Sequence, residues 1–184
     1  MMKRTVLTLI LALLAVFVVG CQERTDRTES GGVLLEVAFS GNEIPFRISV
    51  NNTTAVQVPE ITIQSVVANA NAPVSDLMTV ELDTLEVVYE RVDNGTRVPT
   101  PLVFDILTTV GPGSTTTLND WVVMSLGQLR NPPLSDLLFE NGGIDSETGS
   151  QVITMNLIVR VYGRTLGGIN LESVPRAFTM EFVQ

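Results

Sequence analysis

The sequence predicts an all-β fold: a sandwich of antiparallel sheets with about seven to nine strands, with a barrel as the second choice. Three observations support this prediction. Apolar and polar residues alternate with period two along much of the chain after residue 32. Clusters of Gly, Pro, Asn and Asp interrupt the alternation at frequent intervals. After the first 20 residues, no segment of ten or more residues shows a helical period.

The first predicted strands lie in residues 33–39 and 46–50, where apolar side chains occupy one face of each segment. The next segment, 56–67, is also rich in β-forming residues. It contains Pro59, which has no backbone N–H to donate. We therefore expect an edge strand or a break at that position.

A long strand, or two shorter ones, is predicted over residues 77–92. The apolar positions change phase near Asp83 and Thr84, which predicts a bulge or a corner. The tripeptide 93–95, Asp-Asn-Gly, is a strong turn signal. Residues 96–101 contain two prolines, and we expect them to be extended and peripheral.

Further strands are predicted at 102–109 and 114–126, and we expect Trp121 of the second to lie in the core. The sequence Asn-Pro-Pro at 131–133 predicts the start of one short helical turn. The longest loop then covers residues 140–150.

The strongest alternation in the chain lies in residues 151–162. Residues 177–183 alternate again, with Phe178, Met180 and Phe182 on one face. We expect these two segments to pair as an antiparallel hairpin. No linker interrupts residues 33–184, so the sequence predicts a single domain there.

The N-terminus has the pattern of a secretory signal. Lys3 and Arg4 precede an uncharged apolar run that ends at Gly20. The run is short for a membrane-spanning helix, which needs about 20 apolar residues. An ordinary signal with an incidental cysteine and an uncleaved membrane anchor are the alternatives.

The sequence Val18-Val19-Gly20-Cys21 resembles the lipobox of bacterial lipoproteins, and Cys21 is the only cysteine in the chain. The resemblance implies diacylglycerol on the Cys21 thiol, cleavage after residue 20 by signal peptidase II, and acylation of the new amine, for example with palmitate. Two or three acyl chains anchor a protein stably. Gln22 favours the outer membrane over the inner membrane, by the rule known for enteric-type bacteria.

Removal of residues 1–20 would leave nine arginines, no lysine and twenty acidic residues, a formal charge of −11. A surface of this charge repels nucleic acid, so we expect no nucleic-acid partner. Residues 21–32 are polar, charged and end in glycine, and are expected to be a flexible tether between lipid and domain.

Candidate catalytic residues are few. The chain has no histidine, and no lysine remains after residue 20 to activate a serine. The acidic residues are scattered, and no pair stands out as the two carboxylates of a glycosidase. We therefore expect no enzyme activity and no cofactor.

Calcium is the metal that the composition favours, because it prefers oxygen ligands. The densest group of such ligands is Glu140, Asn141, Asp145 and Glu147, and Asp93 with Asn94 is a second candidate. Neither has EF-hand spacing. Solvated polar residues of a loop are the alternative for both.

Arg91, Arg160 and Arg164 are expected to pair with nearby carboxylates on exposed strand faces.

The segments 87–95 and 159–164 resemble the immunoglobulin-like domain of uncharacterised bacterial envelope lipoproteins. The resemblance covers residues 77–184 and implies a fold and a location, but no activity. The antibody pattern Cys…Trp…Cys is absent.

We thus expect a lipid-anchored, non-enzymatic envelope protein with a structural or protein-interaction role; the alternative is a small-ligand, glycan or calcium-dependent binding module. The strand edges near Pro59 and 99–101, and the loop 140–150, are the expected contact surfaces.

Overall fold

A computed structural model describes residues 32–39, 47–71 and 73–184. The predicted signal sequence, Cys21 and the tether up to residue 31 lie outside the described residues. The described part is mostly β-structure and contains nine strands. The strands are β1 (Val33–Phe39), β2 (Arg47–Ser49), β3 (Val56–Val67), β4 (Val80–Arg91), β5 (Leu102–Val110), β6 (Thr115–Met124), β7 (Val152–Thr165), β8 (Asn170–Glu172) and β9 (Arg176–Val183).

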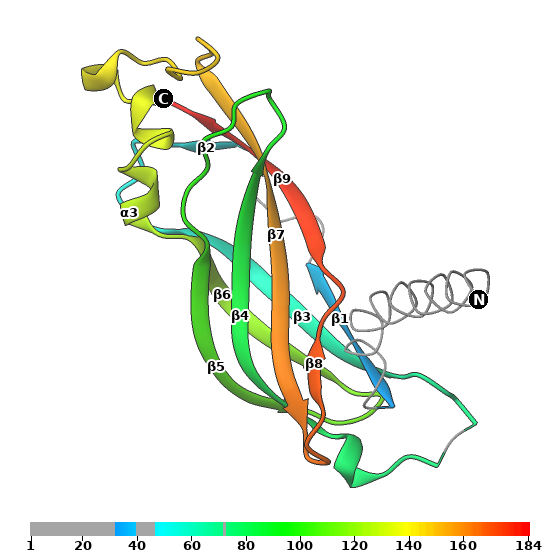
Figure 1. Cartoon of the computed structure of the whole chain (residues 1–184). Coiled ribbons are helices and arrows are strands. Elements are labelled where there is room, and N and C mark those ends of the chain that lie inside the picture. Colours follow the sequence, from blue (N-terminus) through cyan, green and yellow to red (C-terminus); the bar gives the residue numbers. More distant parts are fainter. Residues whose placement is uncertain (1–31, 40–46, 72) are drawn as a thin grey trace, which may run out of the picture.

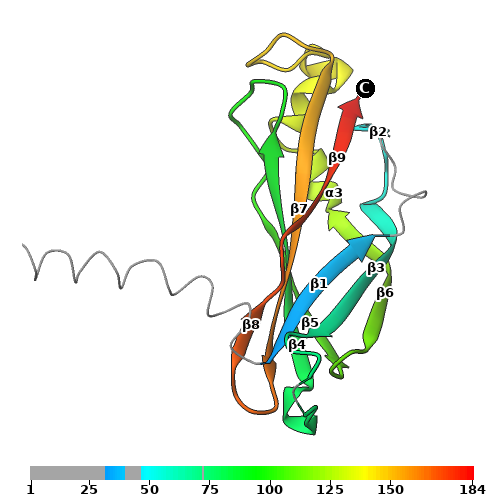
Figure 2. The same cartoon turned by 90° about the vertical axis from the view of Figure 1, so that its right-hand side faces the viewer.

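The strands form two sheets (Figures 1 and 2). The smaller sheet has the order β1-β3-β6, and both of its pairs are antiparallel. The larger sheet has the order β2-β9-β7-β4-β5, with β8 paired to β7. All of its pairs are antiparallel except that of β2 with β9. This architecture confirms the predicted all-β class and the expected pairing of the last two long strands.

Alternation along the strands builds one hydrophobic core between the sheets. In β7 the five inward positions from Ile153 to Val161 are all fully buried. The core cluster runs through the described chain from Val33 to Phe182. Burial of such side chains is the main force that holds the layers together, at roughly 1.5–3 kcal/mol for each large one.

An aromatic pair bridges the two sheets along each side of the molecule. Phe39 of β1 meets Phe178 of β9 edge to face, with ring centroids 4.9 Å apart. Phe104 of β5 meets Trp121 of β6 in the same geometry at 5.5 Å. These contacts fill the lateral openings between the layers, and each pair contributes about 0.5–1.5 kcal/mol beyond its buried area. Trp121 is partly buried and packs against the core, as expected.

The predicted phase change in β4 is confirmed as a bulge. The register of β4 shifts between Leu82 and Thr84 relative to both β5 and β7. Gly163 of β7 pairs with Leu82 at this point. A Cβ on Gly163 would lie 2.5 Å from the carbonyl oxygen of Glu81, so the close approach of the two backbones requires glycine.

Two predicted details of the N-terminal strands are wrong. Pro59 does not break β3, and β3 is the middle strand of its sheet rather than an edge strand. Its pairing with β1 ends at Ile61, so the missing N–H lies beyond the stretch that is paired on both sides. β2 also departs from the predicted antiparallel pairing. It crosses to the larger sheet and pairs in parallel with β9.

Four short helical segments complete the described part: η1 (Asp76–Met78), α3 (Leu126–Leu129), η2 (Leu134–Leu137) and η3 (Phe139–Asn141). The segment η2 confirms the helical turn that the Asn-Pro-Pro sequence predicts. The long loop after it, residues 142–151, has turns but no strand.

The two ends of the elongated molecule carry different segments (Figures 1 and 2). We call residues 91–98 and 134–150 the network end. We call residues 73–79 and 165–170, beside Gly32, the entry end. β4 runs from the entry end to the network end, and β7 returns in the opposite direction. Twelve residues of β4 place the two ends about 40 Å apart.

Candidate functional site

The candidate site is centred on Arg91, the last residue of β4. The inward positions Leu85, Val87 and Tyr89 belong to the core, and Arg91 takes the next place in this alternation. Its side chain is only 1% exposed. A guanidinium in this position needs partners, because an unpaired buried charge is strongly destabilising.

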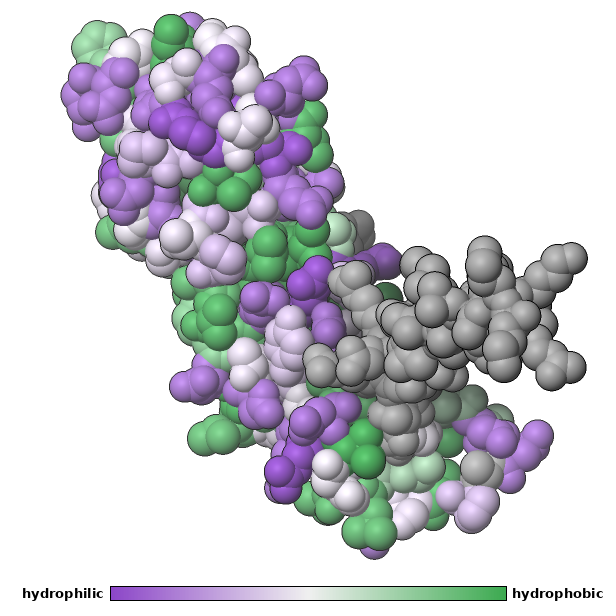
Figure 3. Space-filling model, in the orientation of Figure 1, coloured by the Kyte–Doolittle hydropathy of each residue, from purple (hydrophilic) through white to green (hydrophobic). Residues whose placement is uncertain are grey.

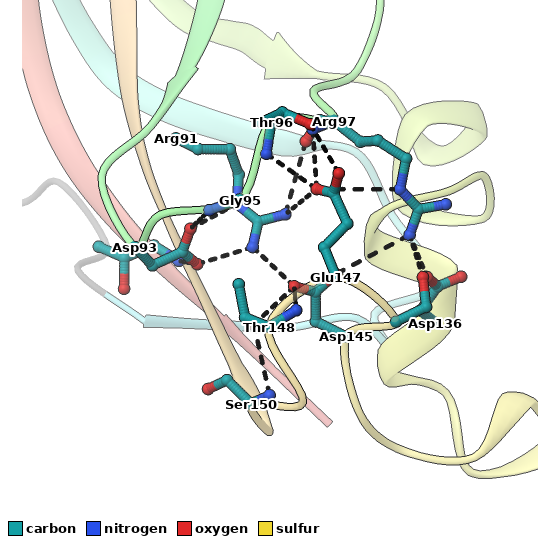
Figure 4. A network of polar contacts seen from close by, with 12 residues as sticks. Arg91, Asp93, Gly95, Thr96, Arg97, Asp136, Asp145, Glu147, Thr148 and Ser150 are labelled. Atoms are coloured by element: carbon teal, nitrogen blue, oxygen red, sulfur yellow. Dashed lines mark hydrogen bonds and ion pairs between the residues drawn. The ribbon is translucent and has the colours of Figure 1, made fainter.

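Two aspartates compensate Arg91 (Figure 4). Its Nε and Nη2 atoms donate to the two carboxylate oxygens of Asp93 at 2.6 and 3.0 Å. Nη2 also donates to Oδ2 of Asp145 at 2.9 Å. A Cβ on Gly95 would overlap the guanidinium of Arg91, so the glycine of the predicted turn also makes room for this ion pair.

Asp145 is fully buried. Its Oδ2 accepts hydrogen bonds from the backbone N–H and the hydroxyl of Thr148, at 3.0 and 2.6 Å. Burial alone would raise the pKa of Asp145, but the hydrogen bonds from Arg91 and Thr148 outweigh it and lower the pKa to about 2. The alternative to a calcium ligand, a solvated loop residue, is therefore wrong for Asp145.

Glu147 binds the backbone of the turn that follows β4. Its Oε2 accepts from the N–H groups of Thr96 and Arg97, both at 2.9 Å, and its Oε1 accepts from the Thr96 hydroxyl at 2.6 Å. The backbone hydrogen bond from Arg97 and the bonds from Thr96 lower the pKa of Glu147. One carboxylate thus fixes two consecutive peptide groups of an otherwise irregular segment.

Arg97 also connects the turn after β4 to the segment 134–150. Its Nη2 donates to Oδ2 of Asp136 at 2.6 Å and also contacts the Ser146 hydroxyl, which itself donates to Asp136 at 2.7 Å. Burial raises the pKa of Asp136, but hydrogen bonds from Ser146 and Arg97 outweigh it and lower the pKa. The network therefore ties residues 91–97 to residues 136–148 at several points.

A second buried polar group lies next to this network, where α3 packs against β4. The Tyr89 hydroxyl donates to the carbonyl oxygen of Val123 at 2.8 Å and lies 3.3 Å from Oε1 of Gln128. Gln128 also completes a capping box with Ser125 and donates to the carbonyl of Thr100 at 2.6 Å. Burial raises the pKa of Tyr89 despite the hydrogen bond with Gln128. These bonds fix α3, from which the chain continues into η2.

The chemistry of the Arg91 network is structural. Each of the four carboxylates accepts hydrogen bonds from a guanidinium or from N–H groups. As a result, all four have pKa values below the ordinary range: Asp93, Asp136, Asp145 and Glu147. A general acid needs the opposite shift, towards neutral pH. The arrangement can hold two chain segments together.

The four predicted calcium ligands are dispersed over these contacts. Asp145 pairs with Arg91, and Glu147 accepts hydrogen bonds from Thr96 and the backbone of Arg97. Asn141 donates its amide to the carbonyl of Ser135 at 2.8 Å, and Glu140 is exposed on η3. Of the second candidate pair, Asp93 binds Arg91 and Asn94 occupies the turn at φ 69°. Within residues 32–39, 47–71 and 73–184, no three Asp, Glu, Cys or His residues gather into a group that could hold a metal ion.

The network end presents apolar side chains outward. Phe139 of η3 is 82% exposed, and Val92, Val98 and Ile144 are also exposed. All four belong to the two segments that the ion pairs connect. The ion pairs thus connect two segments that both expose large apolar side chains to solvent.

The outer face of the larger sheet carries a weaker polar group. Arg160 lies 3.7 Å from both Glu86 and Glu172, and the Tyr162 hydroxyl donates to Glu86 at 2.9 Å. Burial and the contact with Glu86 raise the pKa of Tyr162. The expected surface pairing is confirmed for Arg160. Arg164 lies nearby in a depression of about 750 Å³, whose lining is Glu81, Leu82, Asp83, Leu107, Thr108, Thr109 and Arg164.

The expectation of a surface ion pair is wrong for Arg91. Its buried position could have been inferred, because the alternation Leu85, Val87, Tyr89 continues to Arg91 without a break. The partner Asp145 had no such signal, since it lies 54 residues further along the chain in a segment with no periodicity.

No family model, curated protein or solved structure matches this chain. In the part of the chain that the structure describes, no helix is long and apolar enough to cross a membrane. The assignment of a function therefore depends on the residues and the geometry alone.

Proposed function

We propose that the protein is a lipid-anchored, non-enzymatic envelope protein that presents an interaction surface to another protein. The observation that carries the anchor is the position of the only cysteine, directly after Val18-Val19-Gly20 and a signal-like apolar run. Cys21 carries diacylglycerol, the processed chain begins at Cys21, and Gln22 directs it to the outer membrane.

The topology supports an immunoglobulin-like sandwich as the scaffold. In that fold the first, second and fifth strands share one sheet, and the third, sixth and seventh share the other. The sheet β1-β3-β6 corresponds to the first of these sets, and the neighbouring strands β4, β7 and β9 correspond to the second. β2 and β8 are then short additions, and β5 is an extra strand beside β4. The scaffold explains how loops at one end lie far from the point where the chain enters.

The surface that faces the partner is the network end. It lies about 40 Å from Gly32, at the far end of β4. The buried ion pairs of Arg91 hold its segments in one arrangement, so little conformational entropy is lost when a partner binds. We expect Phe139, 82% exposed, to contribute most to binding, because aromatic side chains are enriched among the residues that dominate protein interfaces.

The experiment that tests the anchor compares the full chain with its Cys21→Ala variant in a bacterial host. Mass spectrometry should find a diacylglyceryl-modified N-terminus that begins at Cys21 in the first protein only. Membrane fractionation should find the variant released. Equal masses and equal fractionation for the two proteins would refute the lipid anchor.

The interaction surface has its own test. A photo-crosslinking residue in place of Phe139 should yield a discrete adduct in intact cells. The same residue in place of Leu107, which is 98% exposed on the edge strand β5, is the matched control. Adducts at Leu107 and none at Phe139 would move the surface from the network end to the sheet edge.

A binding module for a small ligand or glycan is the second candidate. The depression at the bulge of β4 favours it, since two carboxylates, Arg164 and the exposed Leu107 line one hollow of about 750 Å³. A glycan array on the purified chain tests it, with Arg164→Ala as the variant that should lose any signal.

A further inference from the structure

Four apolar side chains are exposed in two adjoining loops at the entry end, opposite the network. Leu77 of η1 is 62% exposed, and Val74, Leu166 and Ile169 are exposed beside it. They come from two loops that are nearly 90 residues apart in the sequence. Figure 3 shows apolar surface at this end, which is the lower end in that view.

Backbone hydrogen bonds hold the two loops against each other. The N–H of Gly167 donates to the carbonyl of Leu77, and the N–H of Leu166 donates to the carbonyl of Thr79, both at 2.9 Å. Side chains of the two loops are close, since a Cβ on Gly167 would lie 3.8 Å from the Cβ of Leu77. The apolar group is therefore formed before any partner arrives.

The chain enters the described domain at this same place. Gly32 packs on the side chain of Met78, the neighbour of Leu77, so closely that a Cβ on Gly32 would lie 2.5 Å from its terminal methyl group. Its carbonyl accepts from the N–H of Ala68 at 3.0 Å. Ten residues, 22–31, lie between Cys21 and Gly32. Their covalent length limits the distance between these two residues to about 40 Å.

We propose that this apolar group, Val74, Leu77, Leu166 and Ile169, dips into the interfacial layer of the membrane that holds Cys21. The inference rests on the proposed lipid anchor, which brings the entry end to the bilayer. Shallow insertion of apolar side chains into the headgroup region is favourable in proportion to the apolar area buried. The chain is acidic after residue 20, so apolar contact rather than attraction to anionic lipid drives the docking. Asp76, exposed in the same loop, keeps the contact at headgroup depth.

Docking at this end orients the molecule. The long axis of β4 then points away from the bilayer, and the network end stands about 40 Å from the contact. The acyl chains alone would leave the domain free to tumble within the reach of residues 21–31. The contact adds an orientation to the anchor.

The test uses the processed full chain, reconstituted into vesicles of phosphatidylethanolamine and phosphatidylglycerol. Leu77→Cys and Leu166→Cys variants carry a polarity-sensitive fluorophore on the new thiol, and Phe139→Cys is the matched control at the other end. Cys21 is the only natural cysteine, and its thiol is blocked if it carries lipid. We expect the emission at positions 77 and 166 to shift to shorter wavelength. Quenching by spin-labelled lipid should be several-fold stronger there than at position 139.

Three other outcomes overturn the inference. Equal quenching at all three positions means that the domain lies flat or tumbles on the bilayer. Aqueous emission at 77 and 166 in vesicle-bound protein refutes the docking of the entry end, while the lipid anchor stands. Labelling of Cys21 in the unsubstituted chain shows a free thiol, which refutes the anchor itself and removes the basis for the docking.

Discussion

The two ends of the molecule expose similar apolar side chains but are held together by different forces. At the network end, buried charges join segments that are about 50 residues apart, and Asp145 and Arg91 are almost completely shielded from water. At the entry end, the loops around Leu77 and Leu166 meet through backbone hydrogen bonds. A long irregular segment such as 134–150 has few ladder hydrogen bonds of its own, so side-chain charges must fix it.

A loop rich in charge can thus be held in place by side-chain ion pairs, where a strand is held by its backbone ladder. The carboxylates that look like solvated loop residues or metal ligands in the sequence are the partners of two arginines. The order of the network end therefore depends on a few named ion pairs. The order of the entry end depends on the backbone and should survive most single substitutions.

The largest effect is expected from Asp145→Asn, at the network end. The variant keeps the size of the side chain but leaves Arg91 with two charged partners instead of three: Asp93, and Glu147 at 3.8 Å. Because Asp93 still pairs with Arg91, we expect the free energy of unfolding to fall by roughly 1.5–3 kcal/mol, the range for a lost hydrogen bond to a charged group. Urea denaturation should show this loss. The control is Glu181→Gln, in the exposed pair with Arg47 at 2.7 Å, which should change stability by less than about 1 kcal/mol. Equal losses would show that the buried pair is no stronger than a surface pair.

Gly163→Ala tests the strand framework that connects the two ends. The Cβ of the new alanine would lie 2.5 Å from the Glu81 carbonyl oxygen. This oxygen belongs to the backbone, so it cannot move away by a change of side-chain rotamer. We expect a loss of roughly 1–3 kcal/mol in unfolding free energy. Gly127→Ala is the matched control, because a Cβ there meets only the Ser125 hydroxyl at 3.8 Å. A neutral result at Gly163 would contradict the close approach at the bulge.

Acid should weaken the network end. The pKa of Asp145 is lowered to about 2 by Arg91 and Thr148 against the effect of burial, so the unfolded chain takes up protons before the folded one does. The stabilisation is complete above about pH 5 and is lost as the pH falls towards 2. For Asp145 it amounts to about 2 kcal/mol. The slope of stability against pH between 4 and 2 should be smaller in Asp145→Asn, and an unchanged slope would contradict the assignment.

A smaller effect is expected on the outer face of the larger sheet. Glu86→Gln weakens the contacts with Arg160 and Tyr162, which are partly solvated. The unfolding free energy should fall by less than about 1 kcal/mol. A loss as large as that of Asp145→Asn would mean that this group, too, holds the fold.

The smallest effect is expected from calcium. Asp145 and Glu147 are engaged by Arg91 and by the backbone of residues 96–97, so millimolar calcium or a chelator should leave the melting temperature unchanged. A rise in melting temperature with calcium would favour the binding-module alternative and would show that the cation displaces an arginine.

The sequence predicts the framework of this fold well. Period-two alternation identifies β7 and β9 and their pairing, and the phase change at Asp83 predicts the bulge in β4. These features are local, because a strand buried on one face must alternate. The parallel pairing of β2 with β9 is not local and has no signal in either segment.

The candidate site is predicted only in part. Residues 93–95 and 140–150 are recognisable as a turn and a loop with many oxygen ligands. The ion pairs that join the two segments cannot be recognised in the sequence, because the charge that joins them belongs to Arg91, which occupies an inward strand position. Lipid on Cys21 remains a prediction from the motif, since Cys21 lies outside the described residues.

The central claim is that Arg91 and its carboxylates fix the network end. Amide hydrogen exchange followed by mass spectrometry tests it most directly, in the unsubstituted chain and in Asp145→Asn. We predict slow exchange in peptides that cover 92–99 and 140–150, a marked acceleration of both in the variant, and no change in peptides that cover 73–79 and 165–170. Fast exchange of residues 140–150 in the unsubstituted chain, or equal acceleration at both ends, would contradict the claim.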